Sequence, residues 1–213
     1  VVPAAPVVSP TAVRVVPAAP IVPAAPVVVP GLDPGIPAHS EHARQEVVDD
    51  RPAAAMTQAF GTDLAALVAQ PGANHVTWHD QAFPDRPLRL HAARPVRFTP
   101  DTHLLFVLHG VRRNGEDYRD FWLPFVDEAE LLAISIEFPE TSFPDYLWYN
   151  FGNLHAADGT PNPREAWTFA IPDRLFGALH QQGITRRRRY GLFGHSAGGQ
   201  FVHRMLSFGW RDR

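Results

Sequence analysis

The chain has 213 residues, a formal net charge of −3 at neutral pH and no cysteine. This length suffices for one ordinary domain, and the mild charge gives no indication of binding to nucleic acid or to an acidic membrane surface. The lack of cysteine excludes disulfides, thiolate metal sites and a cysteine nucleophile, and no apolar run reaches the length of a transmembrane helix.

The first part of the chain, residues 1–55, is a low-complexity segment rich in Pro, Ala and Val. VVPAAP occurs at 1–6 and 15–20, and IVPAAP follows at 21–26. Because proline fixes φ and removes a backbone donor, we expect this segment to be extended and disordered. It is interpreted either as a spacer or as translated sequence upstream of the first methionine, Met56. No signal peptide is recognisable, which favours a cytoplasmic location and leaves an envelope or secreted one open.

Residues 56–213 have the pattern of a globular α/β domain. Apolar residues at helical spacing predict a short helix within 57–72, which Pro71-Gly72 ends. Alternating apolar and polar residues then predict strands over 75–83 and 86–95, with a turn at Pro84-Asp85 between them.

The remaining elements alternate between strand and helix. Unbroken apolar runs predict strands that are covered on both faces. The strands are predicted over 103–110, 131–139 and 189–194, and the helices over 115–130, over 171–183 and after Ser196. This alternation favours right-handed crossovers and a mostly parallel, doubly wound sheet.

The clearest chemical motif is Gly194-His195-Ser196-Ala197-Gly198, which fits G-x-S-x-G between a predicted strand and a predicted helix. A sharp strand-to-helix turn strains the backbone of the serine and requires small flanking residues. It exposes the hydroxyl at the carboxyl end of the sheet, beside the N-terminus of the next helix. The alternative is a glycine-rich turn with an incidental serine.

A second element, His109-Gly110, ends an earlier buried strand, where a loop that stabilises an oxyanion would begin. Ester hydrolysis passes through a tetrahedral oxyanion, which two backbone N–H groups can stabilise. We expect one N–H from Ala197, directly after Ser196, and the other from Val111 or its neighbour.

Together, LLFVLHG (104–110) and GLFGHSAGG (191–199) resemble the α/β-hydrolase superfamily, in particular its esterase, polyhydroxyalkanoate-depolymerase-like and dienelactone-hydrolase-like branches. The resemblance covers about residues 75–213. It implies Ser196 as a nucleophile that forms an acyl-enzyme with a small-molecule ester, and the amides of Val111 and Ala197 as the oxyanion hole. No cofactor is expected.

The family places a catalytic acid and then a histidine base after later strands. No such strands precede Arg213, so we expect a fold truncated after the helix that follows Ser196, without the acid and the base. The residues present do not fit these roles. His195 is expected to point away from the serine, His203 lies about two helical turns further on, and Asp212 has no strand to present it. A structural hydrogen bond is the expected role of His109.

Three further features of the sequence carry weaker functional signals. Trp148 and Tyr149, within DYLWYNFGN (145–153), are candidate walls of a substrate pocket, with core packing as the alternative. The run of four arginines at 186–189 is interpreted as a solvated loop. No metal is predicted, because three histidines lack the spacing of metal ligands: His75, His79 and His91.

The first functional hypothesis is therefore a serine esterase. The second is an inactive remnant or a binding protein, and the third is a peptidase or thioesterase that uses the same turn. Because an open sheet edge invites pairing, the missing C-terminal half or an oligomer partner is expected to supply further strands.

Overall fold

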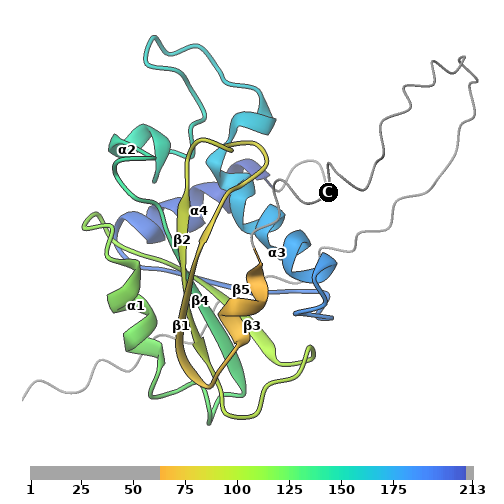
Figure 1. Ribbon diagram of the computed structural model, residues 1–213. Coiled ribbons are helices and arrows are strands. Elements are labelled where there is room, and N and C mark those ends of the chain that lie inside the picture. The colour runs from red at the N-terminus through yellow and green to blue at the C-terminus, as the bar shows by residue number, and fades with distance from the viewer. Residues whose placement is uncertain (1–62, 210–213) are drawn as a thin grey trace, which may run out of the picture.

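The computed structural model describes residues 63–209, so the predictions for residues 1–55 and for Asp212 lie outside the described residues. Five strands form a single sheet in the order β1-β2-β4-β3-β5 (Figure 1). The strands are β1 (Gly72–Trp78), β2 (Leu88–Arg94), β3 (His103–Leu108), β4 (Leu131–Glu137) and β5 (Gly191–Gly194). The α-helices are α1 (Gly115–Trp122), α2 (Asp145–Trp148), α3 (Ile171–Gln181) and α4 (Ala197–Gly209), and the 3-10 helices are η1 (Leu64–Val68), η2 (Arg164–Ala166) and η3 (Thr168–Ala170).

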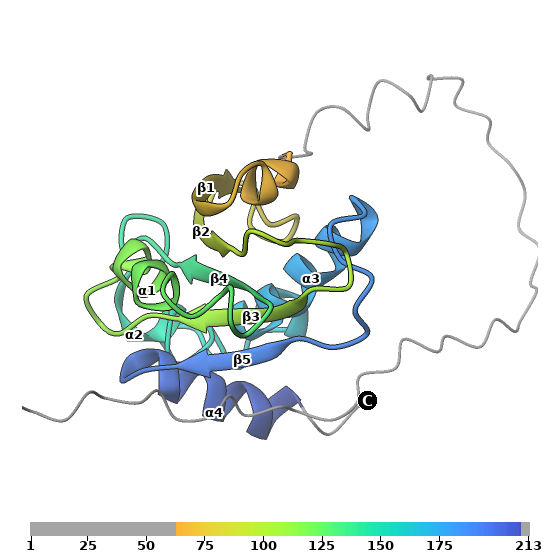
Figure 2. The same cartoon turned by 90° about the horizontal axis from the view of Figure 1, so that it is seen from below.

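The sheet is mixed, and the part formed by β4, β3 and β5 is parallel. β3 lies between β4 and β5 and pairs in parallel with both. β2 pairs antiparallel with β1 and with β4, so an antiparallel pair extends the parallel strands at one edge. Figure 2 shows that β4, β3 and β5 end on the same side of the molecule, where α4 begins. The predicted α/β class is confirmed, with these antiparallel pairings added to it.

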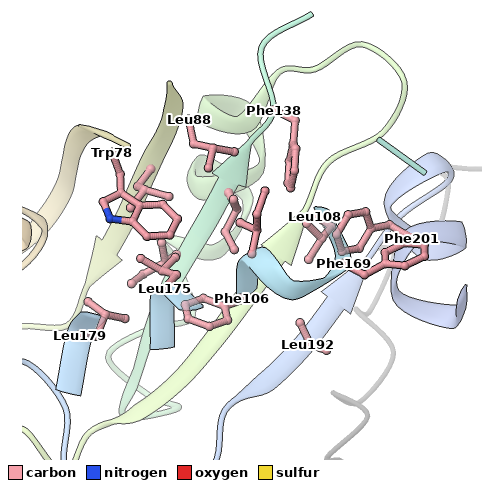
Figure 3. Close-up of a cluster of buried hydrophobic side chains, with 14 of the residues drawn as sticks. Trp78, Leu88, Phe106, Leu108, Phe138, Phe169, Leu175, Leu179, Leu192 and Phe201 are labelled. Carbon is pink, nitrogen blue, oxygen red and sulfur yellow. The ribbon is translucent and has the colours of Figure 1, made fainter. Parts of the chain in front are cut away.

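Helices cover both faces of the sheet, as a doubly wound fold requires. On one face, Phe106 of β3 belongs to the larger core cluster, together with Leu175 of α3 and Phe201 of α4 (Figure 3). On the other face, Val107 of β3 belongs to a smaller cluster with Trp122 of α1. The alternation of side chains along β3 therefore explains why its unbroken apolar run is buried throughout.

Two predicted helices differ from the structure within the described residues. The described part of the segment predicted as a helix over 57–72 contains only the 3-10 helix η1, and the chain is already in β1 from Gly72, which pairs with Arg94. The helix predicted over 115–130 ends at Trp122, two residues before Pro124, because proline cannot continue an α-helix interior. None of the helices within residues 63–209 is long and apolar enough to cross a membrane.

The packing of β3 allows us to predict how a core substitution changes stability. Phe106 is fully buried and its ring centroid lies 4.8 Å from that of Tyr190. We expect Phe106→Ala to lower the free energy of unfolding by about 3–5 kcal/mol, because it leaves a cavity that the sheet cannot close. Urea unfolding measures this loss. Phe121→Ala is the control, since that side chain is 67% exposed, and equal losses in the two variants would contradict the assigned core.

Candidate active site

Ser196 lies in the turn that joins β5 to α4, and its backbone is left-handed, with φ of 55°. A residue with a side chain seldom adopts this conformation, which persists only where the surrounding structure holds it. The neighbouring hydrogen bonds supply that support. The amide of His195 donates to the carbonyl of Leu108 at 3.2 Å, and the amide of Gln200 donates to the carbonyl of Ser196 at 3.0 Å. The side chain of Ser196 is exposed beside the N-terminus of α4.

The two glycines that flank this turn are required by close backbone contacts. A Cβ atom built at Gly194 would lie 2.3 Å from the carbonyl oxygen of Gly198. One built at Gly198 would lie 2.2 Å from the carbonyl oxygen of Leu108. The glycine spacing of the motif therefore comes from the packing of the first turn of α4 directly against the ends of β5 and β3.

The loop after β3 lies against the same turn. A Cβ built at Gly110 would be 3.8 Å from the Cβ of Ser196 and 3.7 Å from Nδ1 of His195. Within residues 63–209, the amides of Val111 and Ala197 donate to no acceptor. The structure thus brings together the two segments that were paired from the sequence.

His109 holds this loop from inside the protein. Its side chain is fully buried, and its Nε2 accepts a hydrogen bond from the amide of Phe138 at 3.0 Å. The proton therefore resides on Nδ1, which donates to the carbonyl of Gly110 at 2.8 Å. Desolvation by burial lowers the pKa of His109 from 6.5 to about 4. Both ring nitrogens are occupied, so His109 positions the loop and is unavailable as a base.

His195 contacts α1, a connection that the sequence did not indicate. Its Nδ1 and the hydroxyl of Tyr118 are hydrogen-bonded at 2.7 Å. The ring of Tyr118 is almost fully buried in the cluster under α1, so its hydroxyl connects that helix to the turn. The contact of Tyr118 with His195 was not predicted from the sequence, because the spacing of Tyr118 and Trp122 is that of an ordinary apolar helix face.

The segment after β4 contains Trp148 and Tyr149, the predicted pocket walls. Tyr149 is only 1% exposed, and its hydroxyl donates to the carbonyl of His109 at 2.6 Å. Burial raises the pKa of Tyr149. The guanidinium carbon of Arg113 lies over the Tyr149 ring, 4.3 Å from its centroid. Trp148 is half-buried under Arg86, whose guanidinium carbon lies 4.0 Å from its ring centroid. Both rings thus pack within the protein.

The remaining polar candidates are distributed over the molecule. His91 pairs with Glu137 at 2.9 Å, and His75 and His79 are exposed. Arg186, the first of the four consecutive arginines, pairs with Asp101 at 2.5 Å on the surface. In the described part of the chain, no group of three or more His, Asp or Glu side chains is placed to hold a metal ion.

The backbone contact at Gly198 makes a prediction with a matched control. We expect Gly198→Ala to lower the free energy of unfolding by about 1–3 kcal/mol, because its Cβ meets rigid backbone of β3. Gly177→Ala, in α3, should raise it by about 0.5–1 kcal/mol, because nothing lies within 4 Å of the added Cβ and alanine favours the helix. Urea unfolding of both variants is the measurement. Equal effects of the same sign would be inconsistent with the described contact.

The burial of neutral His109 makes stability depend on pH. Its pKa is about 4 in the folded state and 6.5 in the unfolded chain, so the unfolded chain takes up the proton first as the pH falls. The stabilisation is complete above pH 6.5 and is lost between pH 6.5 and 4, by about 3 kcal/mol at 1.36 kcal/mol per pKa unit. Unfolding of His109→Gln from pH 4 to 7 should lack this slope, whereas exposed His75→Gln should retain it. Parallel profiles for wild type and His109→Gln would disprove this assignment.

The chain was compared with known proteins. No family model and no curated protein matches it. Among solved structures, the poly(3-hydroxybutyrate) depolymerase LpqC from Bordetella parapertussis is 40% identical over 67% of this chain, with a TM-score of 0.63. Poly(aspartic acid) hydrolase-1 from Sphingomonas sp. KT-1 is 37% identical over the same share, with a TM-score of 0.62.

The chain spans about half the length of these two relatives, 49% and 53%. The sequence identity to both relatives is well above the level at which only the fold is shared. The structure of this chain adds a mixed sheet with helices on both faces and a strand–serine–helix turn. These findings agree with the resemblance that the two sequence motifs carry. The chain therefore belongs to the α/β-hydrolase superfamily.

Proposed function

We propose that this chain carries the nucleophile and the oxyanion hole of a serine hydrolase that cleaves carboxylic esters. The observation that carries the proposal is the left-handed Ser196, exposed at the start of α4 and next to the loop at Gly110. In this reaction, Ser196 Oγ bonds to the carbonyl carbon, the ester C–O bond breaks, and the serine proton passes to the leaving alcohol. Water then hydrolyses the acyl-enzyme and restores the hydroxyl.

The amides of Val111 and Ala197 are proposed to stabilise the oxyanion. Both lack acceptors among the described residues, and Ala197 begins α4, whose N-terminal partial positive charge favours a developing anion. Catalysis requires such donors to be in place before the reaction. The hydrogen bonds of buried His109 and Tyr149 supply this rigidity on the Val111 side.

The base and the acid are proposed to lie outside residues 63–209, in a further segment of the fold or in a partner. Two histidines near Ser196 are already engaged, His109 through both ring nitrogens and His195 through Nδ1 with Tyr118. β5 pairs with β3 on one side and is the last strand of the described sheet. Such an edge can accept further strands, which would carry the missing groups.

The proposed substrate class is an ester within a polymer or oligomer. This proposal is supported by the relative described as a poly(3-hydroxybutyrate) depolymerase. An amide substrate is the second candidate, because the other relative is described as a poly(aspartic acid) hydrolase and that polymer is linked by amide bonds. Profiling of ester and amide substrates separates the two.

The central prediction concerns the reactivity of Ser196. We expect a fluorophosphonate to label the full chain at Ser196, slowly, because loss of a triad base costs several orders of magnitude in rate. Added imidazole should accelerate the labelling by acting as an external base. Mass spectrometry of the labelled peptide and turnover of p-nitrophenyl esters are the measurements.

Ser196→Ala should abolish both labelling and turnover. Ser207→Ala is the control, because Ser207 is also exposed on α4 and lies about three turns further along the helix. If folded chain remains unlabelled with and without imidazole, the serine-hydrolase proposal fails and the binding-protein hypothesis is favoured.

A further inference from the structure

The segment of residues 145–151, α2 with the three residues that follow it, is anchored at both ends to the candidate active site. At its start, Nη2 of Arg113 donates to the carbonyl of Asp145 at 2.7 Å, and Arg113 follows Val111 by two residues. At its end, the side-chain amide of Asn150 donates to Oε1 of Gln200 at 2.7 Å. Gln200 lies one turn after Ser196 on α4. The segment therefore reaches from the proposed oxyanion loop to the helix that begins beside Ser196, as the neighbouring positions of α2 and α4 in Figures 1 and 2 also indicate.

Two aromatic side chains of this segment face solvent. Tyr146 is 57% exposed and Phe151 is 38% exposed, in contrast to the packed rings of Trp148 and Tyr149. Their ring centroids lie 5.2 Å apart at an interplanar angle of 72°, and the amide of Phe151 donates to the carbonyl of Tyr146 at 2.9 Å. We refer to Tyr146 and Phe151 as the aromatic pair.

The aromatic pair is also held from α4. The guanidinium carbon of Arg204 lies 4.0 Å from the ring centroid of Phe151, and Nη1 of Arg204 donates to the carbonyl of Asn150 at 2.7 Å. Rings fixed in this way lose little conformational freedom when a ligand covers them. Two exposed rings in mutual contact offer apolar surface that a ligand can cover.

We infer that the aromatic pair binds the apolar chain of the substrate and makes the site selective for aliphatic polyesters over acidic polymers. The inference rests on the proposed function and adds the substrate's chemical class and the residues that contact it. An acidic chain would need unoccupied cations, but the two arginines that anchor the segment are engaged. Arg113 donates to the carbonyls of Phe138 and Asp145, and Arg204 to Asn150 and Gln200. The segment itself therefore offers aromatic surface, and an acidic chain would depend instead on Arg112, which is exposed next to Val111.

Adsorption tests this inference without requiring catalysis. The full chain carrying Ser196→Ala is mixed with particles of poly(3-hydroxybutyrate), and the bound fraction is measured by sedimentation. We expect the added changes Tyr146→Ser and Phe151→Ser to weaken adsorption at least fivefold, with the urea midpoint as a check on folding. Phe208→Ser is the matched control, because Phe208 is 48% exposed at the far end of α4, and it should change adsorption less than twofold.

Two outcomes of the adsorption test would overturn the inference. One is equal adsorption with and without the aromatic pair, or an equal loss from Phe208→Ser. The other is stronger binding of soluble poly(aspartic acid) that depends on Arg112, the exposed cation next to Val111, and is lost in Arg112→Gln. If Ser196 remains unlabelled while adsorption still depends on the aromatic pair, the proposed hydrolase function fails and the binding surface stands.

A second readout uses chain length. Octyl and ethyl fluorophosphonates are compared for their labelling rates at Ser196 in the presence of imidazole. Replacement of the aromatic pair should lower the octyl-to-ethyl rate ratio at least fivefold. An unchanged ratio would show that the aromatic pair does not contact the chain of the reagent.

Discussion

The site depends on the direct backbone contact between the first turn of α4 and the end of β3. Gly198 lies so close to the carbonyl of Leu108 that a single added carbon would overlap it. The same contact brings the serine turn next to the loop that begins at His109, and the amide of His195 adds a hydrogen bond to Leu108. Ser196 and the loop that we propose to bind the oxyanion come from segments almost ninety positions apart in the chain. They are thereby held together by backbone rather than by flexible side chains.

A set of buried hydrogen bonds around His109 supports this contact. The amide of Phe138, the ring of His109 and the carbonyl of Gly110 form a continuous set of hydrogen bonds, and the hydroxyl of Tyr149 donates to His109. Since burial disfavours the charged form of the imidazole, the loop is held by neutral hydrogen bonds. Each of these groups would be costly to leave unpaired, so together they limit the loop to one arrangement.

Most of the fold could be predicted from local patterns. The apolar runs at 103–110 and 131–139 correspond to β3 and β4, and G-x-S-x-G was placed at a strand-to-helix turn, where Ser196 is found. Strand alternation and glycine spacing are local signals that each segment carries alone. Element ends were less accurate, as at the helix over 57–72, because the start of β1 is decided by pairing with β2.

The side-chain contacts of the site could not be predicted in the same way. Trp148 and Tyr149 were candidate pocket walls, with core packing as the alternative, because substrate contacts often follow the fourth strand in this fold. Both rings pack within the protein, and the exposed rings of that segment are Tyr146 and Phe151. The sequence contains four aromatic residues there and no local signal for which ones face the core. The hydrogen bond between Tyr118 and His195 was equally invisible, since it joins α1 to a turn on a distant strand.

The sequence by itself therefore determined the α/β class, the order of strands β3, β4 and β5 along the chain, and the serine turn with its glycines. These follow from periodicity and from the steric demands of a short motif. The tertiary structure alone decided the mixed pairing of the sheet, the engagement of His109 and His195, and the outward-facing aromatic pair. Such features depend on which distant segments meet, and burial and hydrogen bonding are set only when they do.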